Sequence, residues 1–177
     1  MTEACADTRT DLSLDEALVV LEPYFEVMRE RYLAAGLERC SEVELYSAAW
    51  VHDSARHFAA CTIDGDPAII AAPELAELDP FVVLAVFAHE FGHAVDYLYP
   101  GEFALRGDGP AVRITEGEQD PKHWRQWLRW WKTRDDDTLE FTADAIAEHV
   151  LGVRYGYQGP CSIQSFHATA ARPRGLR

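Results

Sequence analysis

Two histidines four residues apart, His89 and His93, constrain this chain more than any other feature of its sequence. The residues around them, from Asp79-Pro80 to about Tyr99, have the apolar period of a helix, and an Asp-Pro pair is a typical helix start. On a helix, residues four apart differ by about 40° around the axis and about 6 Å along it, so both imidazoles leave the same face. A second segment of the chain must therefore bring polar groups to that face, because unsatisfied buried imidazoles are costly.

Glu90 gives the string His89-Glu90-Phe91-Gly92-His93 a chemical meaning. Two imidazole nitrogens on one helix face can bind a tetrahedral zinc ion at about 2.0–2.1 Å. Glu90, about 100° further round the helix, would flank that ion and take a proton from water on it. The alternative is a pair of buried core histidines, each of which would need its own polar partner. We favour a zinc (Zn2+) site with His89 and His93 as ligands and Glu90 as general base.

A third protein ligand is expected, because a catalytic zinc ion has three and keeps one position open. The best candidates are Glu140 and Asp144, four apart on a second predicted helix from 138 to 151, with small alanines beside them that would let two helices approach closely. In a metal site Glu140 would bind the ion and Asp144 would accept the outer N–H of a ligating histidine. The alternative is a solvent-exposed acidic stripe extended by Glu148.

Asp96 is a competing ligand. It follows His89 by seven residues and so lies near the same helix face, two turns along. Its alternative role is that of a polar residue capping the exposed end of the helix.

Taken together, the HEFGH string and the Glu140-Phe141-Thr142-Ala143-Asp144 segment resemble the gluzincin branch of the zincin metallopeptidases. The compact size and the short upstream strand are similar to minimal gluzincins and to ImmA/IrrE-like peptidases. The resemblance covers roughly residues 67–152. It implies that His89, His93 and Glu140 bind zinc, that Glu90 is the base and that Asp144 supports a ligand.

The order of the expected elements, a helix, a few strands and then helices, predicts an α+β domain, and the resemblance implies a zincin-like one. We expect an α+β, zincin-like architecture, in which a small mixed or antiparallel sheet packs an edge strand on the HExxH helix and a second helix supplies a ligand. One such domain would span residues 1–177, with an irregular tail from about 153. An extended peptide substrate would add to the edge strand, whose residues are Ala68, Ile69, Ile70 and Ala71.

The function that follows is that of a zinc metallopeptidase acting on a protein or peptide, an endopeptidase rather than an exopeptidase. The alternative is a catalytically weak or inactive zincin-like scaffold in a phage-associated or regulatory assembly. Such peptidases need a donor for the oxyanion of the tetrahedral intermediate, often a Tyr or His outside the main motif. Candidates near the end of the chain are Tyr155, Tyr157 and His167, none of which the spacing singles out.

The rest of the chain gives weaker signals. A serine followed three residues later by a glutamate, Ser13 and Glu16, predicts a capped first helix that Gly36 ends, and Pro23 inside it predicts a kink or a late start. Pro67 at the start of a predicted strand favours an edge position. The other expected elements are strands at 42–50, 55–63 and 67–72, a turn at 64–66, a short helical turn after Pro73, a loop at 101–120 and a Trp-rich helix at 121–133.

Charge and cysteine usage exclude some partners. Acidic residues outnumber basic ones by 30 to 16, which gives a net charge of −14 and argues against nucleic-acid and anionic-membrane binding. Four scattered cysteines and a polar, acidic N-terminus predict a cytoplasmic protein, or a virion-associated one if phage-encoded, that is not secreted by a signal peptide. The basic tail, residues 172–177, is expected to dock on the chain's own acidic surface or on a partner.

Overall fold

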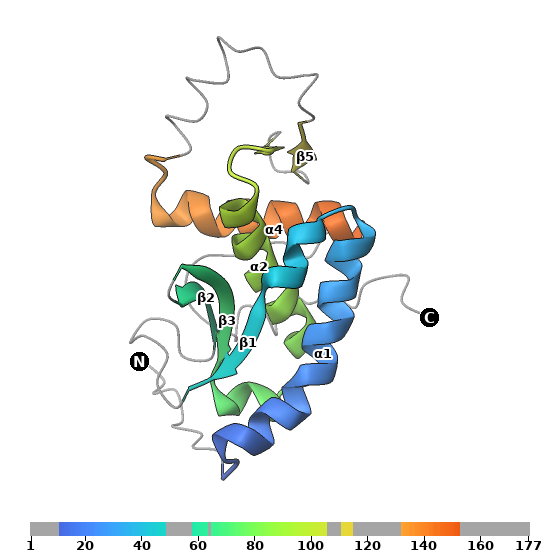
Figure 1. Ribbon diagram of the computed structural model, residues 1–177, viewed down its shortest axis with the longest axis vertical. Coiled ribbons are helices and arrows are strands. Elements are labelled where there is room, and N and C mark those ends of the chain that lie inside the picture. Colours follow the sequence, from blue (N-terminus) through green and yellow to red (C-terminus); the bar gives the residue numbers. More distant parts are fainter. Residues whose placement is uncertain (1–10, 49–57, 64, 106–110, 115–131, 153–177) are drawn as a thin grey trace, which may run out of the picture.

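The computed structural model describes residues 11–48, 58–63, 65–105, 111–114 and 132–152. Within this part of the chain, helices pack against a three-stranded mixed sheet and a two-stranded hairpin, so the fold is α+β as expected (Figure 1). The elements are α1 (Leu14–Ala34), η1 (Glu38–Glu42), β1 (Glu44–Ser47), β2 (Phe58–Ile63), β3 (Asp66–Ala71), η2 (Pro73–Glu77), α2 (Pro80–Leu98), β4 (Phe103–Ala104), β5 (Val112–Arg113) and α4 (Asp136–Leu151).

The first helix confirms the predicted capping box. The Ser13 hydroxyl accepts a hydrogen bond from the Glu16 N–H at 3.3 Å, and the Glu16 carboxylate accepts one from the Ser13 N–H at 2.9 Å. The helix continues through Pro23, so a late start is wrong, and Gly36 follows it with a positive φ of 78°. One face of α1 enters the core through Ala17, Leu21, Phe25, Met28 and Tyr32.

The sheet has the order β1-β3-β2, with β1 parallel and β2 antiparallel to β3. The predicted turn at 64–66 is confirmed and joins β2 and β3 as a hairpin: Ile63 pairs with Asp66, and Gly65 between them has a φ of 95°. Within the described residues, the predicted strands at 42–50 and 55–63 are confirmed as β1 and β2.

The predicted edge position of β3 is wrong, because β3 is the central strand. The residues proposed to receive a substrate backbone, Ala68, Ile69, Ile70 and Ala71, are paired with β1 on one side and β2 on the other. Pro67 did not prevent this, because the β1 ladder begins one residue later, at Ala68. The edges of the sheet among the described residues are β1, which packs beside α1, and β2, which packs beside α2.

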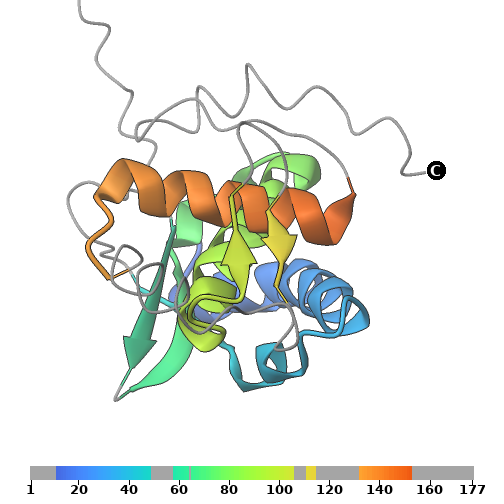
Figure 2. The ribbon, with the colours of Figure 1, turned by 90° about the horizontal axis from the view of Figure 1, so that it is seen from above.

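The second helix is the centre of the fold. As predicted, the Asp79 side chain caps it by accepting a hydrogen bond from the Phe81 N–H at 2.9 Å. The sheet and α1 flank α2, and α4 crosses it (Figures 1 and 2). By length and composition α2 is apolar enough to cross a membrane, but 72% of the relevant window is buried inside the fold. Its apolar side chains therefore form the core that holds the polar face in place.

The segment after α2 is more ordered than the sequence suggested. The predicted loop at 101–120 contains the antiparallel pair β4–β5, which lies against α4. There the Ala111 N–H donates to the Ala145 carbonyl at 2.8 Å, and the Phe103 ring meets His149 edge-on at 5.7 Å. The predicted Trp-rich helix at 121–133 lies outside the described residues, apart from a turn at its last two positions.

Candidate metal site

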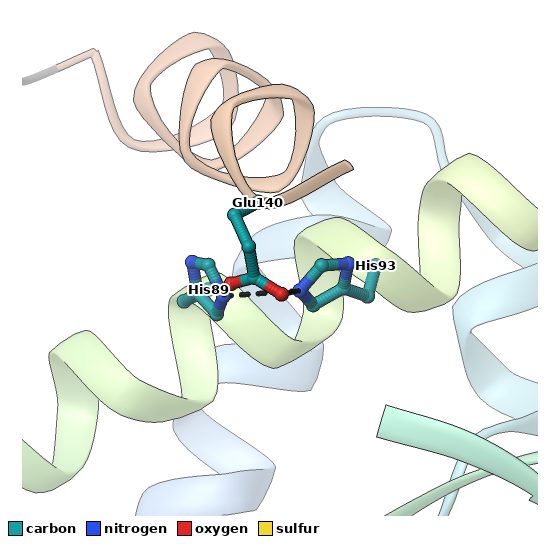
Figure 3. Close-up of side chains that lie close together, drawn as sticks. All are labelled: His89, His93 and Glu140. Atoms are coloured by element: carbon teal, nitrogen blue, oxygen red, sulfur yellow. Dashed lines mark hydrogen bonds and ion pairs between the residues drawn. The ribbon is translucent and has the colours of Figure 1, made fainter. Parts of the chain in front are cut away.

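Side chains from two helices converge where α4 crosses α2. The Nε2 atoms of His89 and His93 lie 3.0 Å apart, and the Glu140 carboxylate lies between the two rings (Figure 3). One carboxylate oxygen is 2.9 Å from the His89 Nε2 and the other is 3.3 Å from the His93 Nε2. In the described part of the chain, these three residues form the one group of His, Cys, Asp or Glu side chains that could hold a metal ion.

The donor set fits zinc in chemistry and in spacing. Two imidazole nitrogens and one carboxylate are a usual ligand set for a catalytic zinc ion. Atoms held about 2.0–2.1 Å from a tetrahedral ion lie roughly 3.3 Å from one another, and the observed separations are 3.0, 2.9 and 3.3 Å. The sequence prediction that His89, His93 and Glu140 lie together agrees with this geometry.

Asp144 lies behind His89, as the sequence suggested. Its Oδ1 is 2.8 Å from the His89 Nδ1, and its side chain is only 4% exposed. A carboxylate on the outer nitrogen fixes the ring orientation and directs Nε2 toward the site. Glu148, one turn further along α4, is 6% exposed, so the alternative of a solvent-exposed acidic stripe is wrong.

The electrostatics of the metal-free site follow from this crowding. Burial lowers the pKa of His89, but hydrogen bonds with Asp144 and Glu140 outweigh burial and raise the pKa to about 10. Burial raises the pKa of Glu140, and the hydrogen bonds with His89 and His93 outweigh it, so the net shift is strongly downward. The two carboxylates around the His89 ring therefore favour its protonated form.

Glu90 is buried beside the ligands but does not join them. It follows His89 on α2 and lies on the same turn, where burial keeps bulk water away from its carboxylate. That position is compatible with the predicted role of a base that acts next to a metal ion without binding it.

Asp96 is not part of the cluster, so its prediction as a competing ligand is wrong. Its carboxylate forms an ion pair with the Arg134 guanidinium, and the pair is buried between α2 and α4. The alternative role of Asp96, an exposed cap at the end of the helix, is wrong for the same reason.

Two residues that matter to the site were not singled out from the sequence. A Cβ atom built on Gly92 would lie 2.2 Å from the backbone oxygen of Ala143, so only glycine permits this approach of α2 and α4. The Tyr32 hydroxyl donates to the Ala88 carbonyl at 2.6 Å, one residue before His89, and its ring stacks on Phe91 at 5.2 Å. A glycine inside a strongly apolar helix was the available signal for the first, whereas nothing local marks a tyrosine 56 residues away.

The candidate oxyanion donors Tyr155, Tyr157 and His167 lie outside the described residues, as does the basic tail at 172–177.

Compared with protein-family models, with curated proteins and with solved structures, the chain shows no significant match in any of the three. The case for a metal site therefore rests on the side chains themselves.

Proposed function

We propose that this protein is a zinc-dependent metallopeptidase of the gluzincin type. The observation that carries the proposal is the convergence of two Nε2 atoms from α2 with the Glu140 carboxylate from α4, while Asp144 engages the outer nitrogen of His89. A purely structural zinc site is usually closed by four protein ligands. Three ligands with a buried glutamate adjoining them are instead what hydrolysis needs.

In this proposal each side chain has a distinct task. His89, His93 and Glu140 would hold the ion, which when bound would polarise a peptide carbonyl and acidify water. Glu90 would accept a proton from the attacking water and deliver it to the leaving amine. Asp144 would keep the Nε2 of His89 directed at the site throughout.

The substrate in this proposal is an extended peptide that pairs with the outer edge of β2. Among the described residues β2 is an edge strand that packs beside α2, whereas β1 packs beside α1. Strand addition would pair with the edge of β2 that no described strand occupies, and would lay a peptide beside the helix that bears the ligands. β2 thus replaces β3 in the role that the sequence suggested for Ala68–Ala71.

The test combines metal content with hydrolysis. Protein purified without a histidine tag should contain one equivalent of zinc by mass spectrometry and should cleave denatured casein or a mixed peptide library. Glu90→Gln should retain zinc and the folded state but lose about 10²–10⁴-fold in hydrolysis, because it removes proton transfer and leaves the ligands intact. Glu22→Gln, an exposed position on α1, is the matched control and should behave as wild type.

Two results would contradict the proposal. A wild-type protein without stoichiometric zinc would remove the metal site. Zinc-loaded wild type that is as inert as Glu90→Gln would favour the scaffold over the enzyme.

A further inference from the structure

A buried ion pair links the two ligand helices a short distance from the metal site. Arg134 precedes α4, and its side chain is 3% exposed, while the Asp96 side chain on α2 is 10% exposed. The two Nη atoms of Arg134 engage the two carboxylate oxygens of Asp96, one of them at 3.3 Å. The Arg134 Nη1 also donates to the Thr142 hydroxyl at 3.1 Å, and that hydroxyl donates to the Thr138 carbonyl at 2.6 Å.

This Asp96–Arg134–Thr142 network starts next to the metal ligands on both helices. Asp96 is three residues after His93, and Thr142 is two residues after Glu140. On the other side of the ligands, the Asp144–His89 hydrogen bond also joins α4 to α2. Two polar links, Asp144–His89 and Asp96–Arg134, therefore connect the two parts of the chain that carry the proposed ligands.

Stability alone does not explain such a pair. Removing two charges from water costs several kcal/mol per ion, and apolar replacements of buried ion pairs are often as stable or more stable. The helices already have an extensive apolar interface and the close Gly92–Ala143 approach. What apolar contacts lack is direction, whereas a two-pronged guanidinium–carboxylate contact fixes relative position and orientation.

We propose that the Asp96–Arg134–Thr142 network is a positioning device that holds Glu140 in register with His89 and His93, and that it thereby sets the metal affinity of the site. Glu140 is the sole ligand from α4 in the described cluster, so a small slide of α4 along α2 moves it away from both imidazoles. The inference rests on the proposed zinc site. In it Asp96, Arg134 and Thr142 do not bind the metal but position the residue that does.

The test separates register from stability. The double variant Asp96→Leu/Arg134→Met removes both charges together and leaves neither uncompensated in the interior. We expect it to unfold thermally within a few degrees of wild type, yet to bind zinc about 10–100-fold more weakly, the usual loss when a supporting residue near a metal is changed. Arg134→Lys keeps the positive charge but loses the two-point contact of the guanidinium with the carboxylate, and it should give an intermediate zinc affinity.

A spectroscopic readout and a matched control complete the design. With cobalt in place of zinc, the double variant should show visible absorption bands shifted or weakened relative to wild type, because the carboxylate ligand has moved. The control is Glu102→Leu/Arg113→Met, which removes a partly exposed ion pair of the β4–β5 region and should leave both affinity and spectrum unchanged.

The outcomes are distinguishable. Wild-type zinc affinity and an unchanged cobalt spectrum in the Asp96→Leu/Arg134→Met protein would overturn the positioning role and leave the proposed function intact. A loss of zinc affinity that merely follows a large loss of thermal stability, with no intermediate value for Arg134→Lys, would also overturn it. Wild-type protein that binds no zinc would instead overturn the proposed function on which the inference rests.

Discussion

The α-carbon of Gly92 approaches the backbone of Ala143 so closely that an added Cβ would lie 2.2 Å from the Ala143 carbonyl oxygen and 2.8 Å from its carbonyl carbon. Real Cβ atoms essentially never approach backbone atoms within 3.0 Å. The contact lies between His89 and His93 on one helix and between Glu140 and Asp144 on the other. The metal ligands can therefore meet only because the residue before His93, at the point where α4 crosses α2, is a glycine.

Gly92→Ala gives the first prediction. Inside an ordinary helix this change stabilises a protein by about 0.5–1 kcal/mol, but here the helices must separate, and we expect destabilisation by about 3 kcal/mol. Zinc affinity should fall with it, because separation moves Glu140 away from the histidines. Thermal unfolding and chelator competition measure the two effects. Ala143→Gly should not rescue the variant, since the clash is with backbone; a stabilised Gly92→Ala protein would refute the close approach.

Glu140→Gln gives the second prediction. An amide oxygen is a weaker zinc ligand than a carboxylate, and the variant also loses the charge that compensates the ion. We expect zinc affinity at least about 100-fold below wild type, measured by competition with a chelator of known affinity. Glu148 is unsuitable as a control because it is buried, so exposed Glu22→Gln serves instead. Equal zinc retention in the two variants would remove Glu140 from the ligand set.

Tyr32→Phe gives the third prediction. The hydroxyl is fully buried, burial raises its pKa well above the ordinary value, and it donates to the Ala88 carbonyl at 2.6 Å. Its removal should lower the free energy of unfolding by about 1 kcal/mol, with the zinc affinity unchanged because the hydroxyl contacts no ligand. Tyr24→Phe, at a partly buried tyrosine on the same helix, is the control. A loss of zinc binding in Tyr32→Phe would show that this hydroxyl acts on the site.

The parts of the site that could be predicted from sequence are those set by local spacing. His89 and His93 lie on the same helix face in any fold in which residues 80–98 are helical. Glu140 and Asp144, also four residues apart on a helix, likewise share a face. Their pairing across helices was a chemical inference, since two imidazoles and two carboxylates satisfy one another. The capped start of α1 and the β2–β3 hairpin also depend on adjacent residues only.

The rest depends on contacts between distant segments. Nothing near Asp96 indicates that its partner is Arg134, 38 residues away, so the sequence alone predicts a ligand or a helix cap at this position. The position of β3 in the sheet depends on where β1 packs. Pro67 lacks a backbone N–H at its own position only, so it does not prevent pairing from Ala68 onward. The short β4–β5 pair gains support from α4, which no pattern within 101–120 reveals.

The last prediction concerns the proton that zinc must displace. In the metal-free protein the pKa of His89 is lowered by burial but raised further by its hydrogen bonds with Asp144 and Glu140, to about 10. At lower pH the ring carries a proton on each nitrogen, and the one on Nε2 has to leave before that atom can bind an ion. Acid therefore favours the zinc-free form, and the apparent zinc affinity should rise about tenfold per pH unit between pH 6.5 and 8.5.

A histidine with the ordinary pKa of about 6.5 would instead give an affinity that levels off above pH 7. Asp144→Asn should flatten the rise, because it replaces the carboxylate that stabilises the protonated ring of His89 with a neutral amide. It should also weaken binding about 10–100-fold, since an amide orients the ring less firmly. Calorimetry in two buffers of different ionisation enthalpy should show about one proton released per zinc bound at pH 7.5 in wild type and less in Asp144→Asn. An affinity independent of pH across this range would mean that His89 does not bind the ion through the nitrogen that faces Glu140.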